Sequence, residues 1–197
     1  MLTSKKIPDM SLSLQKFAED FADALYQVDA SGISHKQFQP GIGPFGESDA
    51  VKAALAWLKQ NKQVVYGNAV TKRQPDLLIP GEWQLEFKVV RPFGDNGKEA
   101  ENWSQNVLHP YPGNTSSLGD CFKLLQSTGL EGKAVVVFGY EHSPAKILLE
   151  PCIAGFELLA RQLLGFSLSK RLELSRLPLR HPVHQVLRVY AWQLVTG

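Results

Sequence analysis

Two short runs of alternating apolar and polar residues constrain the fold of this chain most strongly. The runs cover 76–79 and 83–90, and a Pro-Gly-Glu sequence at 80–82 separates them. Alternation is typical of a strand with one buried face, and a proline followed by glycine is typical of a tight turn. The segment therefore predicts a β-hairpin with a three-residue loop, in which Ile79 lies opposite Trp83.

This register places two carboxylates side by side. Asp76 lies directly opposite Glu86, and Lys88 shares their face of the sheet. Directly opposed positions have Cβ atoms about 5 Å apart. A two-residue loop would instead pair Asp76 with Leu85 and scatter the apolar side chains, so the hydrophobic pattern selects the three-residue loop. The opposite face of the hairpin is then wholly apolar and consists of Leu77, Ile79, Trp83, Leu85, Phe87 and Val89.

Two opposed carboxylates repel each other unless a cation compensates them. Hard oxygen ligands suit Mg²⁺, and also Mn²⁺, so we expect Asp76 and Glu86 to bind such an ion. Lys88 could orient or help deprotonate an attacking water, or stabilise charge on a phosphate. Metal-assisted hydrolysis of a phosphodiester bond needs these components. The alternative is a strand whose charges face solvent, because the acid–x–Lys pattern is short and also occurs at 131–133.

The remaining hydrophobic patterns predict a mixed α/β fold, in which helices pack against a mixed β-sheet. Residues 32–46 are rich in glycine and proline, which is typical of a loop, and Ser48 is a plausible N-cap for the next helix. Strands are expected over 63–70, 76–79, 83–90, 133–140, 166–174 and 183–195. Helices are expected over 11–28 (with Ser11 or Ser13 as its N-cap), 48–62, 98–108, 118–128 and 151–164.

The residues of the hairpin resemble the motif of the PD-(D/E)XK nuclease superfamily. Pro75-Asp76 is followed by nine residues and then by Glu86-Phe87-Lys88. The resemblance implies a restriction-endonuclease-like core of order α-β-β-β-α-β over about 47–140. The chain would then be a single nuclease-like domain, with an N-terminal helix and loop over 1–46 and a basic C-terminal extension of one helix and two strands over 141–197.

The same resemblance assigns roles to individual residues. It implies that Asp76 and Glu86 bind Mg²⁺ and that Lys88 positions the water. Many members of the superfamily add an acid from the first helix of the core. Glu47 is the best candidate for that acid, and Asp49 is the reserve.

The charge of the chain is unevenly distributed. The net charge is only +2, but residues 161–197 contain six basic residues and one acidic residue, a net charge of +5. Such a region is either an ordinary solvated surface or a surface that contacts phosphate. We expect the second, with salt-sensitive binding to nucleic acid, most directly double-stranded DNA. The expected contact residues are Arg91, Lys170, Arg171, Arg176, Arg180 and Arg188.

Three weaker patterns lie near these elements. Residues 41–46 fit G-x-G-x-x-G, but Pro44 removes an amide from a phosphate cradle, so a turn that delivers Glu47 is the better interpretation. His181 and His184 predict a surface loop or a basic loop near phosphate, rather than a zinc site. Asp120 and Lys123, on the helix after the hairpin, either approach the site or face solvent.

The composition limits the class of protein. Hydrophobic residues make up 44% of the 197 residues, which argues against disorder, and no apolar run is long enough for a membrane helix. The N-terminus lacks a secretory signal, and two cysteines suit a reducing cytoplasm. We therefore expect a cytoplasmic, Mg²⁺-dependent DNA endonuclease of restriction or defence type, forming a homodimer if its target is palindromic. The alternatives are an inactive nucleic-acid-binding or assembly protein on the same fold, and a nuclease that acts on RNA.

Overall fold

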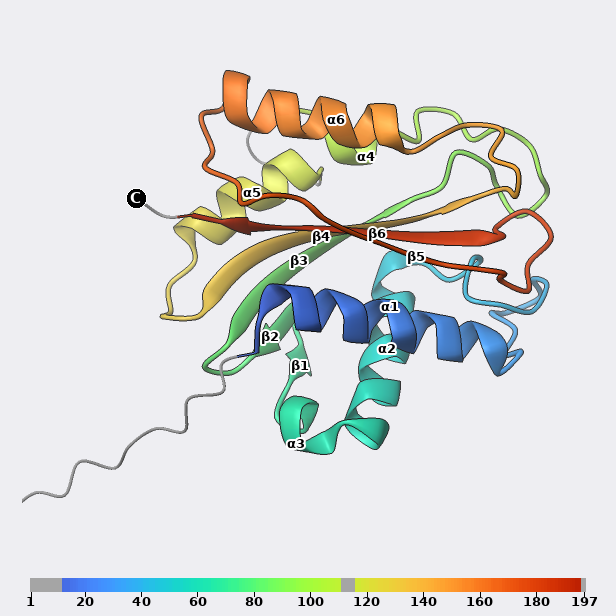
Figure 1. Cartoon of the computed structure of the whole chain (residues 1–197), viewed down its shortest axis with the longest axis horizontal. Helices are drawn as coiled ribbons and strands as arrows, with labels where there is room; N and C mark the ends of the chain where they lie inside the picture. Colours follow the sequence, from blue (N-terminus) through green and yellow to red (C-terminus); the bar gives the residue numbers. More distant parts are fainter. Residues whose placement is uncertain (1–11, 111–115, 196–197) are drawn as a thin grey trace, which may run out of the picture.

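A six-stranded mixed sheet forms the centre of the computed structural model, which describes residues 12–110 and 116–195. The strand order is β1-β2-β3-β4-β6-β5, and only β3 and β4 are parallel neighbours. The predicted α/β class, with helices flanking a mixed sheet, is confirmed (Figure 1). The strands are β1 (Val70–Thr71), β2 (Leu77–Ile79), β3 (Trp83–Val90), β4 (Gly132–Glu141), β5 (Leu172–Arg176) and β6 (Val186–Leu194).

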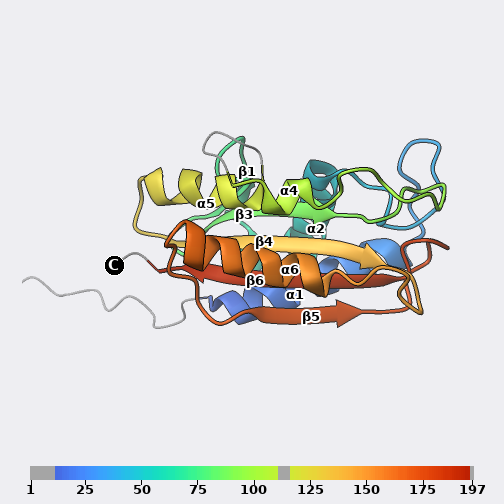
Figure 2. The same ribbon diagram turned by 90° about the horizontal axis from the view of Figure 1, so that it is seen from above.

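Helices cover both faces of this sheet. On one face lie α1 (Leu14–Ala30) and α2 (Glu47–Asn61), followed by the short α3 (Gln63–Tyr66). The other face carries α4 (Gln105–Leu108), α5 (Ser117–Gln126) and α6 (Glu150–Leu158), and α6 continues as a π-helical turn over Leu159–Leu163. Figure 2 shows α4, α5 and α6 side by side above the strands. No helix within the described ranges is both long and apolar enough to span a membrane.

Two apolar layers hold these helices to the sheet. Toward α1, the ring of Phe21 lies 4.9 Å from that of Phe87 and 5.7 Å from that of Phe138. Toward α5 and α6, Val135 and Val137 of β4 are fully buried. Because both faces are covered, the polar side chains of β3 that point away from α1 are also enclosed in protein.

The predicted hairpin register is confirmed. Ile79 pairs with Trp83, and Leu77 pairs with Leu85. Gly81 has a φ of +77°, a conformation that favours glycine and fits the tight loop. The alternative of solvent-facing charges is wrong, because Glu86 is only 4% exposed and Lys88 only 9% exposed.

The strand expected over 63–70 is largely wrong. Residues Gln63–Tyr66 form α3, and only Val70 and Thr71 join the sheet. Val64 and Val65 are exposed, whereas the hydroxyl of Tyr66 donates a hydrogen bond to the buried Asp20 at 2.9 Å. This anchor to α1 outweighs the strand preference of the valines.

Other predicted boundaries change less. The helix expected over 98–108 is reduced to α4, and the strand expected over 166–174 begins only at Leu172. Ser13 caps α1 by accepting a hydrogen bond from the Lys16 amide, while Ser11 lies outside the described residues. Ser48 is not an N-cap, because α2 begins one residue earlier, after Gly46.

Candidate active site

The hairpin brings the first carboxylate to β3. Asp76 directly precedes β2, and its Oδ2 accepts a hydrogen bond from the Phe87 amide at 2.8 Å. Phe87 itself points into the apolar layer beneath α1, so its neighbours Glu86 and Lys88 point to the opposite face. The backbone of β3 therefore fixes the Asp76 carboxylate beside the two polar side chains of the same strand.

Glu47 reaches the same strand from the start of α2. Its Oε2 accepts a hydrogen bond from the Val89 amide at 2.9 Å, and its Oε1 lies 3.4 Å from Lys88 Nζ. Residues 41–46 end in Gly46, which precedes the helix and delivers Glu47, as the sequence predicts. The reserve candidate Asp49 is not in the cluster: its carboxylate is 49% exposed and lies 3.7 Å from the imidazole of His35.

Helix α5 supplies two further charged side chains. Asp120 Oδ2 lies 3.3 Å from Lys88 Nζ, and Asp120 Oδ1 lies 2.6 Å from Lys123 Nζ. The Asp120 side chain is 2% exposed. The three-residue spacing puts both residues on one face of the helix, toward β3. Of the two interpretations from the sequence, approach to the site is therefore correct.

The cluster has more negative than positive groups. Four carboxylates, from Glu47, Asp76, Glu86 and Asp120, lie with the ammonium groups of Lys88 and Lys123, which leaves two excess negative charges when all are ionised. Burial, followed by repulsion from Asp76 and Asp120, raises the pKa of Glu86 to about 9. Its Oε1 is buried without a hydrogen-bond partner among the described residues. An orphaned oxygen and a local charge excess fit a divalent cation held by Asp76 and Glu86.

Lys88 is held in its charged form. Burial would lower the pKa of its ammonium group, but the carboxylates of Glu47 and Asp120 outweigh burial and raise the pKa above its ordinary value. Burial also raises the pKa of Glu47 and of Asp120, although Lys88 opposes both shifts. The charge state of the lysine therefore depends on these two acids.

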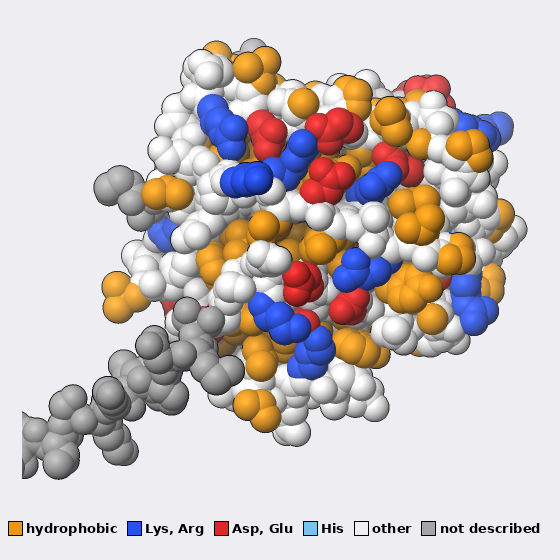
Figure 3. All heavy atoms as spheres, in the orientation of Figure 1, with side chains coloured by type: hydrophobic (Ala, Val, Ile, Leu, Met, Phe, Trp, Pro, Cys, Tyr) orange, Lys and Arg blue, Asp and Glu red, His pale blue; other side chains and the backbone are white. Residues whose placement is uncertain are grey.

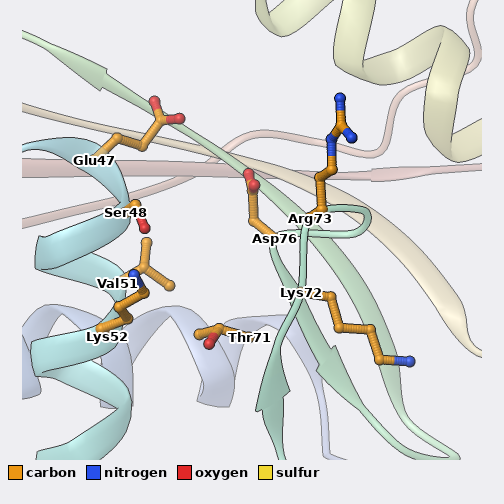
Figure 4. Close-up of a pocket in the computed structure, with 8 residues that line it drawn as sticks. All are labelled: Glu47, Ser48, Val51, Lys52, Thr71, Lys72, Arg73 and Asp76. Carbon is orange, nitrogen blue, oxygen red and sulfur yellow. The ribbon is translucent and has the colours of Figure 1, made fainter.

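A cavity of about 330 Å³ opens beside Glu47 and Asp76. In Figure 4 these carboxylates stand on opposite walls and extend to the same side, with Arg73 rising next to Asp76 and Lys72 turned away. Lys52 of α2 also lines the cavity. Within the described ranges, none of these three basic side chains forms an ion pair, and sequence analysis did not select them. The signal that could have found Lys72 and Arg73 is their position, just ahead of Gln74 and the Pro75-Asp76 dipeptide.

The basic residues expected to bind nucleic acid do not gather at this site. β5 is the edge strand opposite β1 and β2, so Arg176 lies across the sheet from Asp76. Figure 3 shows basic and acidic side chains interspersed on the face that it presents. Three of these arginines form ion pairs with acidic side chains: Arg171 with Glu150 at 2.9 Å, Arg176 with Asp23 at 2.7 Å and Arg188 with Glu141 at 2.9 Å.

The other residues that the sequence predicts to bind nucleic acid have different environments. Arg180 donates a hydrogen bond to the carbonyl of Ala30 at 2.7 Å, and Lys170 is exposed. Arg91, three residues after Lys88, donates to the carbonyl of Gly43 at 3.0 Å. Nucleic-acid binding by these residues stays a prediction, and the contacts of the arginines give them a structural role.

The chain was also compared with known proteins. Searches against protein-family models, curated proteins and solved structures each found no match.

Proposed function

We propose that this chain is a Mg²⁺-dependent enzyme that hydrolyses phosphodiester bonds in DNA. One observation carries the proposal: the half-buried Asp76, next to β2, lies beside Glu86 and Lys88 on buried positions of β3, and one oxygen of Glu86 has no hydrogen-bond partner among the described residues. Buried charge is costly, so a protein retains it where it has a task. Apart from the short helices α3 and α4, the elements follow in the order α2, β1, β2, β3, α5, β4, which supports a core like that of the PD-(D/E)XK superfamily, whose motif the hairpin resembles.

Asp76 and Glu86 would hold the ion, and Mn²⁺ could replace Mg²⁺ on the same oxygen ligands. When bound, the ion supplies Lewis-acid stabilisation of the charge that develops on the phosphate. With the ion bound, Asp76 and Glu86 would both be ionised, and Glu86 would release the proton that burial and repulsion favour in the metal-free protein.

The protein side chains orient and stabilise the reaction. Lys88 is charged at neutral pH, so it acts as a fixed cation toward the phosphate or the attacking water, and not as a base. Glu47 and Asp120 hold its ammonium group from two sides, at 3.4 Å and 3.3 Å. A lysine held in this way loses little side-chain freedom when the substrate binds.

The cavity beside the carboxylates suits a polyanionic substrate. Lys52 and Arg73 line this cavity together with Glu47 and Asp76, whereas the ammonium group of Lys72 extends away from the two carboxylates. Basic side chains of this kind contact backbone phosphates without reading sequence. We propose double-stranded DNA as the substrate, a restriction or defence role in the cytoplasm, and a homodimer if the target is palindromic.

A panel of substrates tests this function. The purified chain is incubated with plasmid DNA, single-stranded DNA and RNA, each with Mg²⁺, Mn²⁺ or EDTA, beside the variant Asp76→Asn. We expect cleavage of plasmid DNA with either metal, none with EDTA, and loss of cleavage in the variant. Cleavage of RNA alone would assign the substrate to RNA instead. No cleavage of any substrate would favour an inactive binding or assembly protein.

A further inference from the structure

A second cluster of metal-ligating side chains lies apart from the carboxylates. It consists of Asp95, in the loop after β3, and of His181 and His184, between β5 and β6. The sequence predicts a surface loop at the histidines, but both are buried and only 1% exposed. This Asp-His-His cluster therefore joins two loops in the interior of the protein.

Each member of the cluster has one buried polar atom for which no described residue provides a hydrogen-bond partner. These atoms are Asp95 Oδ1, His181 Nε2 and His184 Nδ1. One ligand atom from each of the three residues lies within 4.8 Å of the other two, and His184 Nδ1 is 3.6 Å from Asp95 Oδ1. Buried polar groups are normally hydrogen-bonded, so three unpaired ones in one place point to a ligand that binds them together.

The contacts of His184 prepare it as a ligand. Its Nε2 lies 3.0 Å from the carbonyl oxygen of Phe93, which can only accept, so Nε2 carries the proton and Nδ1 keeps its lone pair. A histidine that donates to a carbonyl through its second nitrogen is the usual arrangement of a metal ligand. Burial, the largest cause, lowers the pKa of His184 to about 4, so the imidazole is neutral at pH 7. Gly43 allows this fit, because a Cβ at position 43 would overlap the imidazole.

From this geometry we infer that Asp95, His181 and His184 bind a divalent transition-metal ion, with Zn²⁺ as the best match. Two imidazole nitrogens and one carboxylate oxygen suit Zn²⁺ and its neighbours in the first row, not Mg²⁺. The fourth position would be filled by water. Asp95 also lines a hollow of about 480 Å³ together with Arg91.

Binding requires two local adjustments. Ligand atoms around zinc lie about 3.4 Å apart, so His184 Nδ1 and Asp95 Oδ1, at 3.6 Å, are nearly in place, and any pair near the 4.8 Å limit must approach by more than about 1 Å. His181 Nδ1 lies 3.2 Å from the Val183 amide and 3.3 Å from the His184 amide, which places its proton on Nε2. Coordination through Nε2 moves that proton to Nδ1 and gives up these two contacts. A bridging water would need neither adjustment and is the competing occupant.

The ion would stabilise the loops that follow β3 and precede β6 by cross-linking them. Asp95 follows β3, the strand that carries Lys88, and the histidines precede β6. Arg91 and His184 both contact the segment around Gly43, which leads to Glu47. A metal at the cluster would therefore link the loop after β3 to the loop before β6, next to the segment that leads to Glu47, and its effect would be on stability.

Metal retention and thermal unfolding test the inference. The full chain is stripped with EDTA, dialysed against Zn²⁺, and its bound metal is measured. We expect one Zn²⁺ per chain beyond any ion that Asp76 and Glu86 hold, and a higher melting temperature than that of the stripped protein. The variants Asp95→Asn and His184→Asn should bind at least about tenfold more weakly. The controls His35→Asn and Asp76→Asn should retain Zn²⁺, since neither residue belongs to the cluster.

Cobalt substitution keeps the test valid if the variants fail to fold. Co²⁺ bound by two imidazoles should give visible absorption in the wild-type chain, and Zn²⁺ should displace it. When metal is added, the proton of the His181 imidazole should move to Nδ1. The nitrogen NMR chemical shifts of that ring would report this change of tautomer. A stripped protein that retains no metal and melts at the same temperature with or without Zn²⁺ would assign the cluster to a bridging water and overturn the inference.

Discussion

Lys88 Nζ lies 3.4 Å from Glu47 Oε1, although 41 residues separate the two in the sequence. The other oxygen of Glu47 accepts a hydrogen bond from the Val89 amide, so the start of α2 is fixed to the strand that carries the lysine. This contact links a loop, a helix and a strand into one site. It also makes the charge of Lys88 depend on an acid outside the hairpin motif.

Replacing Glu47 should therefore impair catalysis more than folding. Glu47→Gln keeps an oxygen for the Val89 amide but removes the charge that holds Lys88. We expect DNA cleavage to fall by about 10- to 100-fold, as for other residues that position a catalytic group. Asp49→Asn is the matched control, because Asp49 lies on the same helix outside the cluster. Equal loss of activity in both variants would contradict the role given to Glu47.

The metal-free protein should lose stability as the pH rises. The folded-state pKa of Glu86 is raised to about 9, mainly by burial, so between pH 4.5 and 9 the native state binds more protons than the unfolded state. The contribution of Glu86 to the free energy of unfolding is thus greatest below pH 4.5 and is lost as the pH approaches 9. In EDTA at pH 8, Glu86→Gln should be more stable than wild type by on the order of 1 kcal/mol. Urea unfolding across this pH range measures the difference.

The exposed control Glu101→Gln should follow the wild-type pH dependence, because its carboxylate lies at the surface. A wild-type stability that increases from pH 5 to pH 8 in EDTA would contradict the proposed protonation of Glu86.

Arg73 should contribute to DNA binding through phosphate. Its side chain rises beside Asp76 at the wall of the cavity. Arg73→Ala should weaken binding uniformly across sequences and reduce the salt slope by about 1. Lys170→Ala is the comparison, since Lys170 belongs to the basic C-terminal region. Fluorescence anisotropy at several salt concentrations measures the DNA affinity of both variants. A larger loss of affinity in Lys170→Ala than in Arg73→Ala would favour the C-terminal surface as the DNA contact.

Asp20 should be the most important acid for the fold of α1. Its carboxylate is 2% exposed and accepts hydrogen bonds from Lys16 at 2.7 Å, from Tyr66 at 2.9 Å and from Lys62. Burial alone would raise the pKa of Asp20, but these donors outweigh burial and lower it. Its contribution is therefore present above pH 3.8 and is lost as the pH falls through the lowered pKa.

We expect Asp20→Asn to destabilise the protein by about 3 kcal/mol at pH 7, because a buried ion pair loses one partner. Asp23→Asn, on the same helix, removes an ion pair whose carboxylate is 46% exposed, and should cost less than about 1 kcal/mol. Chemical denaturation of the two variants makes the comparison. Similar losses would show that burial of Asp20 matters less than the structure indicates.

The sequence could predict the hairpin because local rules determine it. Alternating apolar residues and a Pro-Gly turn define its register, and Asp76 and Glu86 follow from that register. Asp120 could be placed on a helix, but its contact with Lys88 depends on how α5 packs over β3. The partners of the C-terminal arginines, such as Asp23 and Glu141, come from distant elements, so counting charge along the chain could not identify them.

Plasmid cleavage by wild type and by Lys88→Ala, each with Mg²⁺ and with EDTA, tests most directly whether the cluster around Lys88 is an active site. Thermal unfolding of both proteins would verify that the variant is folded. We expect wild type to cleave the plasmid only with metal. The cleavage rate of the variant should be lower by at least about 100-fold, because a charged group directed at the phosphate is removed. Unchanged cleavage by a folded Lys88→Ala protein would contradict the assignment of this cluster as the active site.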